Sequence, residues 1–171
     1  MWRILIFCGI CSGLRAFELS SPVFEGATFT VCKVDLRKDR LELFLTAPDG
    51  LPYASFDRLV ALGGTGGVPA VGFAMNAGMF EPGLRPVGLF VTGGRELAPL
   101  NLKSGKGNFY LKPNGVFAVA GGGFVIVDSE KWNAVAGPVR LATQSGPLLV
   151  EKGRIHPGFS ANSTSLYVRN A

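Results

Sequence analysis

The chain has 171 residues, of which 47% are apolar and only 17% are charged, so an intrinsically disordered protein is excluded. Its formal net charge of +5 falls to +3 without Arg3 and Arg15, which lie in a predicted leader. A positive charge this small, with no long run of Lys or Arg, argues against nucleic acid as the main partner. With 24 Gly and 11 Pro, the composition favours a protein rich in strands and turns.

The first 16 residues resemble a secretory signal peptide. Arg3 precedes an apolar run over residues 4–10, and the segment ends at Ala16. The run is shorter than the roughly 20 apolar residues that a permanent membrane helix needs. We therefore predict cleavage after Ala16, a linker over residues 17–26, no membrane span in the mature chain, and a secreted or periplasmic location.

The next part of the chain predicts a hairpin, a helix and a glycine-rich loop. Strands are expected over residues 27–36 and 40–46, where apolar and polar residues alternate on either side of a short charged turn. Residues 55–62 predict a helix with Ser55 as its N-cap. The loop over residues 63–67 follows a helix and precedes a strand, the reverse of the order in a phosphate-binding loop. We interpret this loop as a helix exit.

Residues 70–80 are interpreted as a buried strand that ends in a turn at Asn76, because apolar and small residues alternate along them. An amide followed by Gly78 at a strand end can place a polar group at the lip of a pocket. Phe80 then supplies an apolar wall. Local chemistry alone leaves open the alternative that Asn76 only hydrogen-bonds its own loop.

The C-terminal half predicts short strands joined by turns. Strands are expected over residues 86–92, 108–111, 115–120, 124–127, 139–144, 148–151 and 166–168, and a turn is expected at Lys152-Gly153. A helix is expected over residues 128–136, with Asp128 or Ser129 as its cap. Residues 108–111 and 115–120 are expected to pair as a hairpin. About ten strands and two helices indicate a single α+β domain over residues 27–171 with a mixed or antiparallel sheet. The last strand is interrupted at residue 171, so we expect the domain to be incomplete there.

Polar groups beside glycine recur at the expected strand ends. Asn76, Asn108, Asn114 and the pair Gln144-Ser145 offer amides and a hydroxyl, which both donate hydrogen bonds to sugar hydroxyls and accept them. A standard glycosidase instead needs two carboxylates flanking the scissile bond. Only Glu81 lies near the candidate pocket in sequence, and Asp35 is interpreted as solvent-exposed.

The sequence predicts no metal and no cofactor. Its one histidine, His156, precedes Pro157 in an expected loop and cannot form a histidine-based metal site by itself. No Ser–His–Asp set is recognisable by local motif. We interpret His156 as a structural or solvated residue.

Five sequence blocks in one order resemble the phosphodiester glycosidase domain, a family that includes the animal lysosomal uncovering enzyme. The blocks are residues 74–80, 86–91, 99–117, 142–159 and 163–170. The resemblance covers nearly all of residues 25–171 and is strongest to bacterial members associated with exopolysaccharide. It implies an exported hydrolase that acts on a sugar-1-phosphodiester, such as an N-acetylglucosamine-1-phosphodiester glycan.

The same resemblance implies a site. Its catalytic candidates are Asn76 and Arg169, the latter as the phosphate ligand. Its substrate-binding candidates are Gly78, Phe80, Asn108, Gln144, Ser145 and Gly146. Members of the family continue past the Arg169-Asn170 element into a motif that is expected to supply an acidic residue, so two alternatives are open for this chain: it is inactive alone, or it is incompletely folded. The alternative is a non-catalytic carbohydrate-binding or envelope polysaccharide-associated protein.

Overall fold

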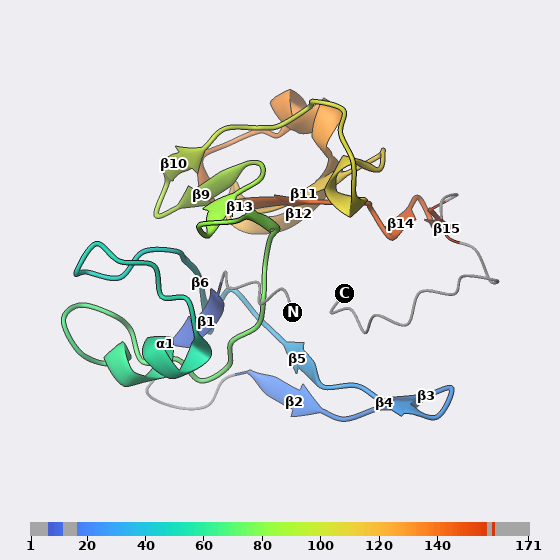
Figure 1. Cartoon of the computed structure of the whole chain (residues 1–171). Helices are drawn as coiled ribbons and strands as arrows, with labels where there is room; N and C mark the ends of the chain where they lie inside the picture. Colours follow the sequence, from blue (N-terminus) through green and yellow to red (C-terminus); the bar gives the residue numbers. More distant parts are fainter. Residues whose placement is uncertain (1–6, 12–16, 157–158, 160–171) are drawn as a thin grey trace. The chain divides into compact units, whose positions relative to one another are not determined.

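A computed structural model describes residues 7–11, 17–156 and 159 (Figure 1). The described chain is rich in strands and has few helices, in agreement with the predicted α+β class. It divides into two compact units, residues 1–77 and residues 78–171, which are described separately. In the described part, no helix is long and apolar enough to cross a membrane.

Three two-stranded antiparallel sheets make up the described strands of the first unit. β1 (Phe7–Cys11) pairs with β6 (Arg40–Phe44), β2 (Glu18–Ser20) pairs with β5 (Val31–Lys33), and β3 (Val23–Phe24) pairs with β4 (Ala27–Thr28). The predicted hairpin between residues 27–36 and 40–46 is therefore wrong. β2 and β3 both lie within residues 17–26, which the sequence predicts as a linker, and their side chains are exposed.

The charged turn between β5 and β6 forms, but its flanking strands do not pair with each other. Asp35 accepts hydrogen bonds at its backbone carbonyl from the amides of Lys38 and Asp39, at 2.8 and 2.7 Å. The Asp39 carboxylate in turn accepts from the backbone N–H of Asp35 at 2.7 Å. β5 and β6 each pair with an earlier segment, β2 and β1.

The core of the first unit forms around its one described α-helix. α1 (Phe56–Leu62) begins as predicted, since Ser55 is extended and its Oγ accepts a hydrogen bond from the backbone N–H of Arg58 at 3.1 Å. Leu59 is fully buried against the other members of the core cluster, which are Phe44, Ala47, Tyr53 and Val68. Gly63 ends the helix as expected.

The buried strand predicted over residues 70–80 is wrong. Residues 70–79 contain no strand longer than an isolated bridge at Asn76, and Gly72 and Met75 are exposed. Val71 and Ala74 are the two residues that pack against the core cluster. These two residues are three positions apart, which does not match the two-residue period of a strand. The segment therefore packs against the core without regular secondary structure.

A five-stranded antiparallel sheet in the order β10-β9-β13-β11-β12 is the framework of the second unit (Figure 1). Its strands are β9 (Phe90–Thr92), β10 (Arg95–Ala98), β11 (Gly115–Ala120), β12 (Gly123–Asp128) and β13 (Val139–Ser145). One face buries a cluster of Leu89, Val91, Val116, Ala118 and Ala142. These apolar residues recur at every second position of their strands, as half-buried strands require.

The strand predicted over residues 108–111 is wrong. Residues Asn108–Tyr110 form a 3-10 turn, η1, and β11 pairs with β12 and β13 instead. The side-chain amide of Asn114 donates to the backbone carbonyl of Phe109 at 2.9 Å. This bond closes the chain before β11 into a compact turn. The Phe109 carbonyl is then already hydrogen-bonded and does not pair with a neighbouring strand.

A second 3-10 segment, η2 (Ser129–Ala134), replaces the helix predicted over residues 128–136. Asp128 caps it as predicted, accepting from the backbone N–H of Glu130 at 3.0 Å. The amide of Val135 bonds to the carbonyl of Trp132, three residues back, which is the 3-10 spacing. Trp132 packs against the buried face of the sheet.

Two small hairpins complete the second unit. β7 (Phe80–Glu81) pairs with β8 (Arg85–Pro86), and β14 (Val150–Glu151) pairs with β15 (Arg154–Ile155). The second hairpin turns at Lys152-Gly153, as the sequence indicates. The strand predicted over residues 166–168 lies outside the described residues.

Candidate functional site

Gln144, near the end of β13, has a fully engaged side chain. It is 1% exposed, and its Oε1 accepts hydrogen bonds from the backbone N–H groups of Leu89 and Asn101 at 3.0 and 2.9 Å. Its Nε2 donates to the backbone carbonyl of Asn101 at 2.8 Å. One carboxamide therefore joins the chain before β9 to the segment that follows β10.

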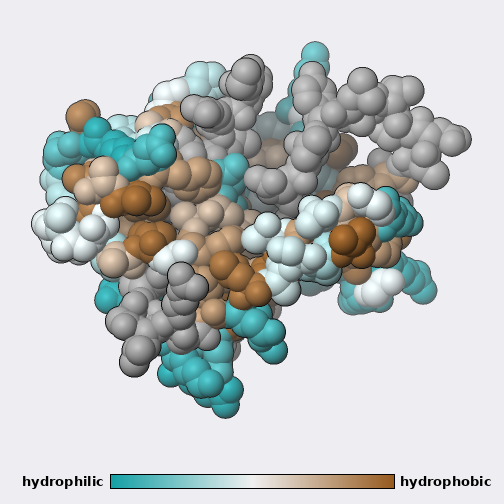
Figure 2. Space-filling view, turned by 90° about the horizontal axis from the view of Figure 1, so that it is seen from below, coloured by the Kyte–Doolittle hydropathy of each residue, from teal (hydrophilic) through white to brown (hydrophobic). Residues whose placement is uncertain are grey.

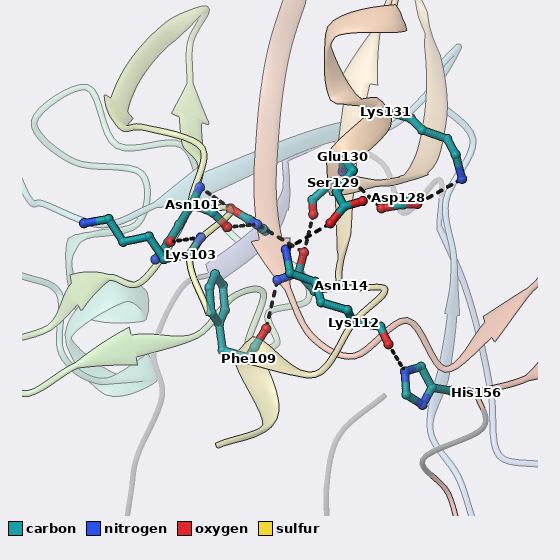
Figure 3. Close-up of polar contacts among 11 residues, drawn as sticks. Asn101, Lys103, Phe109, Lys112, Asn114, Asp128, Ser129, Glu130, Lys131 and His156 are labelled. Atoms are coloured by element: carbon teal, nitrogen blue, oxygen red, sulfur yellow. Dashed lines mark hydrogen bonds and ion pairs between the residues drawn. The ribbon is translucent and has the colours of Figure 1, made fainter. Parts of the chain in front are cut away.

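Asn114 extends this arrangement toward η1 and η2 (Figure 3). Its Nδ2 donates to the Phe109 carbonyl, and its Oδ1 accepts from the Ser129 hydroxyl and, at 3.4 Å, from Gln144 Nε2. Asn114 and Ser129 are fully buried. We call these four side chains, Asn101, Asn114, Ser129 and Gln144, the Gln144 network. Asn101 contributes a further bond from its Nδ2 to the Val87 carbonyl at 2.7 Å.

Two glycines pack directly against this network. A Cβ on Gly88 would lie 2.3 Å from Gln144 Oε1, and a Cβ on Gly146 would lie 2.4 Å from the Phe109 carbonyl oxygen. Both distances are shorter than any ordinary contact, so only glycine fits at either position in this packing. The Ser145-Gly146 turn therefore lies directly on η1, which begins at Asn108.

Seven of the eight predicted site residues lie in the second unit, and six of these are among the described residues. Gly146 packs against Phe109 of η1, so the turn that carries Ser145 and Gly146 lies beside the segment that carries Asn108. The segment with Gly78 and Phe80 is tied to the same region, since the amide of Val87 donates to the Met79 carbonyl at 2.9 Å. The structure thus joins the segments that carry these six residues. It places Gln144 beneath the surface, with its polar atoms directed inward.

The two catalytic candidates are placed differently. Asn76 belongs to the first unit, and its Oδ1 is buried without a hydrogen-bond partner in the described part of the chain. A buried acceptor without a donor is uncommon in folded proteins. Arg169 lies outside the described residues. The catalytic roles of both residues remain predictions.

The acidic residues considered in the sequence are held in ion pairs at the surface. Asp35 pairs with Arg37 at 2.6 Å, and the hydrogen bonds from the Arg37 side chain and backbone hold the pKa of the Asp35 carboxyl well below its usual range. Glu81 pairs with Arg85 at 3.2 Å. Within the described residues, none of the hydrogen bonds of the Gln144 network comes from a carboxylate.

His156 has a structural environment. It is buried, its Nε2 lies 3.0 Å from the Lys112 carbonyl oxygen, and its backbone N–H donates to the Leu149 carbonyl (Figure 3). These contacts fasten the end of the β14–β15 hairpin to the turn before β11. Across the described ranges, no three His, Cys, Asp or Glu side chains gather as metal ligands would.

Sequence reasoning did not assign Asn101, Asn114 or Ser129 to the site. Asn114 stands between Pro113 and Gly115, a setting typical of an exposed turn. Ser129 follows a cap residue, where a serine is equally ordinary. Their burial depends on segments distant in sequence, and the only local signal is the recurrence of amides next to glycine.

A hollow elsewhere in the second unit contains none of the predicted residues. It lies between the β11–β12 hairpin and η2 and is lined by Ala120, Val125, Val127, Lys131, Ala134, Val135 and Ala136. Its walls are largely apolar, and Lys131 is engaged by Asp128 and Glu151. It offers few of the polar groups that recognise a sugar.

The phosphodiester glycosidase family model matches residues 70–171, which is more than half of the chain. The chain belongs to the phosphodiester glycosidase family. The matched range contains all eight predicted site residues and the whole Gln144 network. It also contains the entire five-stranded sheet.

One curated relative is an uncharacterized protein of Escherichia coli strain K12, YigE. It is 34% identical over 154 residues, which cover 89% of this chain and 58% of YigE. The chain therefore spans less than two thirds of that relative's length. No solved structure matches the chain.

Proposed function

We propose that this protein is a glycosidase-type hydrolase of sugar-1-phosphodiesters. The observation that carries the proposal is the family match over residues 70–171. The site geometry supports it, because Gly146 packs against η1 and so brings together the segments of two predicted residues with polar side chains, the Asn108 amide and the Ser145 hydroxyl. Amide and hydroxyl groups of this kind suit hydroxyl-rich ligands, since they both donate and accept hydrogen bonds.

The chemistry is a hydrolysis at the anomeric carbon. Water attacks C1 of the sugar, the C1–O bond breaks, and its electron pair leaves with the phosphate monoester while the water loses a proton. A phosphate monoester is a good leaving group, so protonation by a strong general acid matters less than it does in an ordinary glycosidase. Positioning of the substrate and stabilisation of charge at the phosphate carry more of the rate enhancement.

Two residues are proposed to contact the substrate in this reaction. Arg169 binds the phosphate, because a guanidinium pairs with two phosphate oxygens at once. Asn76 hydrogen-bonds a sugar hydroxyl through its side-chain amide, which is the role that the family resemblance implies. We further propose that the protein acts outside the cytoplasm, in agreement with the leader predicted over residues 1–16.

The experiment is a sugar-release assay with the purified full chain and an N-acetylglucosamine-1-phosphodiester. YigE is assayed beside it, because that relative is longer. We expect Asn76→Ala to lower kcat/KM by about 10²-fold, as the loss of a positioned polar contact does. The matched control is Asn133→Ala, which removes an exposed amide on η2 and should leave turnover unchanged. Equal turnover by the Asn76→Ala variant and the wild type would exclude the proposed role.

One observation favours a second candidate, a carbohydrate-binding protein without catalysis. Ordinary glycoside hydrolysis uses two carboxylates, and no carboxylate joins the Gln144 network in the described chain. Calorimetric titration with the same sugar phosphodiester separates the two candidates. Binding without sugar release, by both this chain and YigE, would favour the binding protein.

A further inference from the structure

The Gln144 side chain makes more connections than a substrate ligand needs. Its Oε1 accepts hydrogen bonds from two backbone N–H groups. Its Nε2 donates one hydrogen bond to the Asn101 carbonyl and a longer one to Asn114 Oδ1. A carboxamide has two donor hydrogens and two acceptor lone pairs at its oxygen. All four are used inside the protein, so no polar capacity remains for a ligand.

The groups held by Gln144 belong to segments that carry the predicted site residues. Leu89 follows Gly88 and Val87, and Val87 bonds to the segment of Gly78 and Phe80. Asn114 holds the Phe109 carbonyl in η1, which begins at Asn108. Gln144 itself precedes Ser145 and Gly146. One side chain therefore sets the relative positions of three segments that are far apart in sequence.

We infer that Gln144 is the positioning residue of this site and that it acts through Asn101 and Asn114, not by contact with the substrate. The inference rests on the proposed function for its catalytic consequence. It also revises the role that the sequence predicts for Gln144, from substrate binding to alignment of the segments that bind substrate. Gly88 is needed for the same arrangement, because the side chain of any larger residue there would displace the Gln144 carboxamide.

Gln144→Glu tests this inference because it keeps the shape of the side chain but replaces the donating NH2 group with a carboxylate oxygen, which only accepts hydrogen bonds. A carboxylate still accepts from Leu89 and Asn101, but its second oxygen faces the Asn101 carbonyl oxygen and Asn114 Oδ1, which are both acceptors. Protonation restores a donor at that oxygen. Burial among neutral groups raises the pKa of such a carboxyl above its usual value near 4.3. The variant should therefore regain the native arrangement in acid.

The charged groups on the segments around Gln144 do not reverse this expectation. Lys112 lies 3.8 Å from Glu130, and Asp128 is paired with Lys131 at 2.9 Å. Lys103 is exposed, and its backbone N–H donates to the Asn101 side chain. The contacts of the Gln144 carboxamide itself are to uncharged groups.

Two readouts are measured at about pH 5 and about pH 8, because the lower pH favours the protonated form of the buried carboxyl. The first is hydrogen exchange at the amides of Leu89 and Asn101, which needs no substrate. The second is kcat/KM for sugar release. We expect Gln144→Glu at the higher pH to exchange roughly tenfold faster at both amides and to lose about 10²-fold in kcat/KM. At the lower pH both values should approach those of the wild type.

The control is Asn133→Asp, which places a carboxylate on the surface and should change neither readout. Protected amides at both pH values with a pH-independent loss of activity would overturn the inference, because they indicate direct contact between Gln144 and the substrate. If the Glu variant does not fold at the higher pH, Ser129→Ala replaces it. This change removes the hydroxyl that donates to Asn114 and should accelerate exchange at Asn101. Unchanged exchange there would also overturn the inference.

The two proposals fail in different ways. A wild-type chain without turnover argues against the proposed function, while the exchange data still decide whether Gln144 holds the three segments. Normal turnover with unprotected Leu89 and Asn101 amides in the wild type would contradict the positioning role alone.

Discussion

The two units of the chain bury their backbones in different ways. In the first, the described strands form two-stranded sheets, and every residue of β2, β3 and β4 is exposed. In the second, β11 and β13 each have neighbours on both sides and are buried along most of their length. A strand with two neighbours satisfies both of its hydrogen-bonding edges, whereas a two-stranded sheet leaves half of its backbone groups to solvent.

Exposed large apolar side chains occur in both units. The first unit exposes Leu19, Val23 and Phe24, and the second exposes Ile126 and Ile155. Figure 2 shows hydrophobic residues lying at the surface beside hydrophilic ones. The five-stranded sheet instead encloses a continuous apolar cluster between its face and η2.

Buried polar groups separate the units less sharply. The second unit buries Asn114, Ser129 and Gln144 with partners for each. Among the described residues, buried side-chain atoms without a hydrogen-bond partner occur in both units: Asp39 Oδ1, Arg58 Nε and Asn76 Oδ1 in the first, and Lys112 Nζ in the second. What distinguishes the second unit is a buried side-chain network whose members are satisfied by one another, and such a network makes a rigid support.

The largest effect is expected from the sheet core. Leu89→Ala removes a fully buried side chain and should lower the free energy of unfolding by about 2–5 kcal/mol, through lost burial and the cavity that remains. Leu19→Ala in exposed β2 should change it by less than about 0.5 kcal/mol. Urea denaturation of both variants measures the difference. Equal losses would show that β2 is as well packed as the sheet.

The contact between the Ser145-Gly146 turn and η1 comes next. Gly146→Ala would force a Cβ to within 2.4 Å of the Phe109 carbonyl oxygen, so we expect destabilisation. Overpacking of this kind costs about 1–3 kcal/mol. Gly123→Ala is the matched control, because nothing lies within 4 Å of its added Cβ. Thermal unfolding compares the two variants. Equal unfolding temperatures would contradict the tight packing at the Ser145-Gly146 turn.

In the first unit, the helix cap gives a smaller expected effect. Ser55→Ala removes the acceptor for the Arg58 amide and should cost about 1 kcal/mol, within the range for lost N-caps. Ser55→Asp keeps an acceptor and should restore the stability. Denaturant midpoints compare the three proteins, and an Asp variant no better than Ala would argue against the cap.

The smallest effect is electrostatic and depends on pH. Burial is the largest single influence and raises the pKa of the Asp128 carboxyl, but hydrogen bonds from Lys131 and the Glu130 amide, with nearby positive charge, lower it overall. A lowered pKa stabilises the fold above the unfolded value near 3.9, and this stabilisation is lost as the pH falls through the folded value.

Asp128→Asn tests that sign while keeping a good helix cap. It should reduce stability at neutral pH by less than about 1 kcal/mol, and the difference from wild type should vanish in acid. Unfolding free energies between about pH 2 and pH 7 provide the measurement, because that range spans the unfolded pKa. If the difference in unfolding free energy between the variant and the wild type stayed constant over this pH range, the effect would come from the changed geometry of the side chain and not from its charge.

Several local elements were predictable because their signals are contained in a few adjacent residues. The Ser55 cap and the Gly63 end of α1, β11 over residues 115–120, and the turn at Lys152-Gly153 all formed as expected. The family resemblance was also readable from ordered sequence blocks and is confirmed by the match over residues 70–171.

Strand pairing was not predictable in the same way. Residues 40–44 carry a clear alternation, yet their partner is β1, which lies in the predicted leader. Residues 108–110 have the composition of a strand, but the Asn114 amide captures the Phe109 carbonyl and closes a turn. The alternation of apolar residues indicates which side of a strand is buried, but it does not indicate which other strand lies beside it.

The sequence by itself determined the strand-rich class and the family. Only the tertiary structure decided that Gln144 points inward, that Asn101, Asn114 and Ser129 complete its hydrogen bonds, and that Gly88 and Gly146 are required by close packing. The physical reason is that a buried amide must find partners for all of its polar atoms. Those partners come from segments more than 10 residues away in the chain, which is the case for the bonds from Gln144 to Leu89, Asn101 and Asn114.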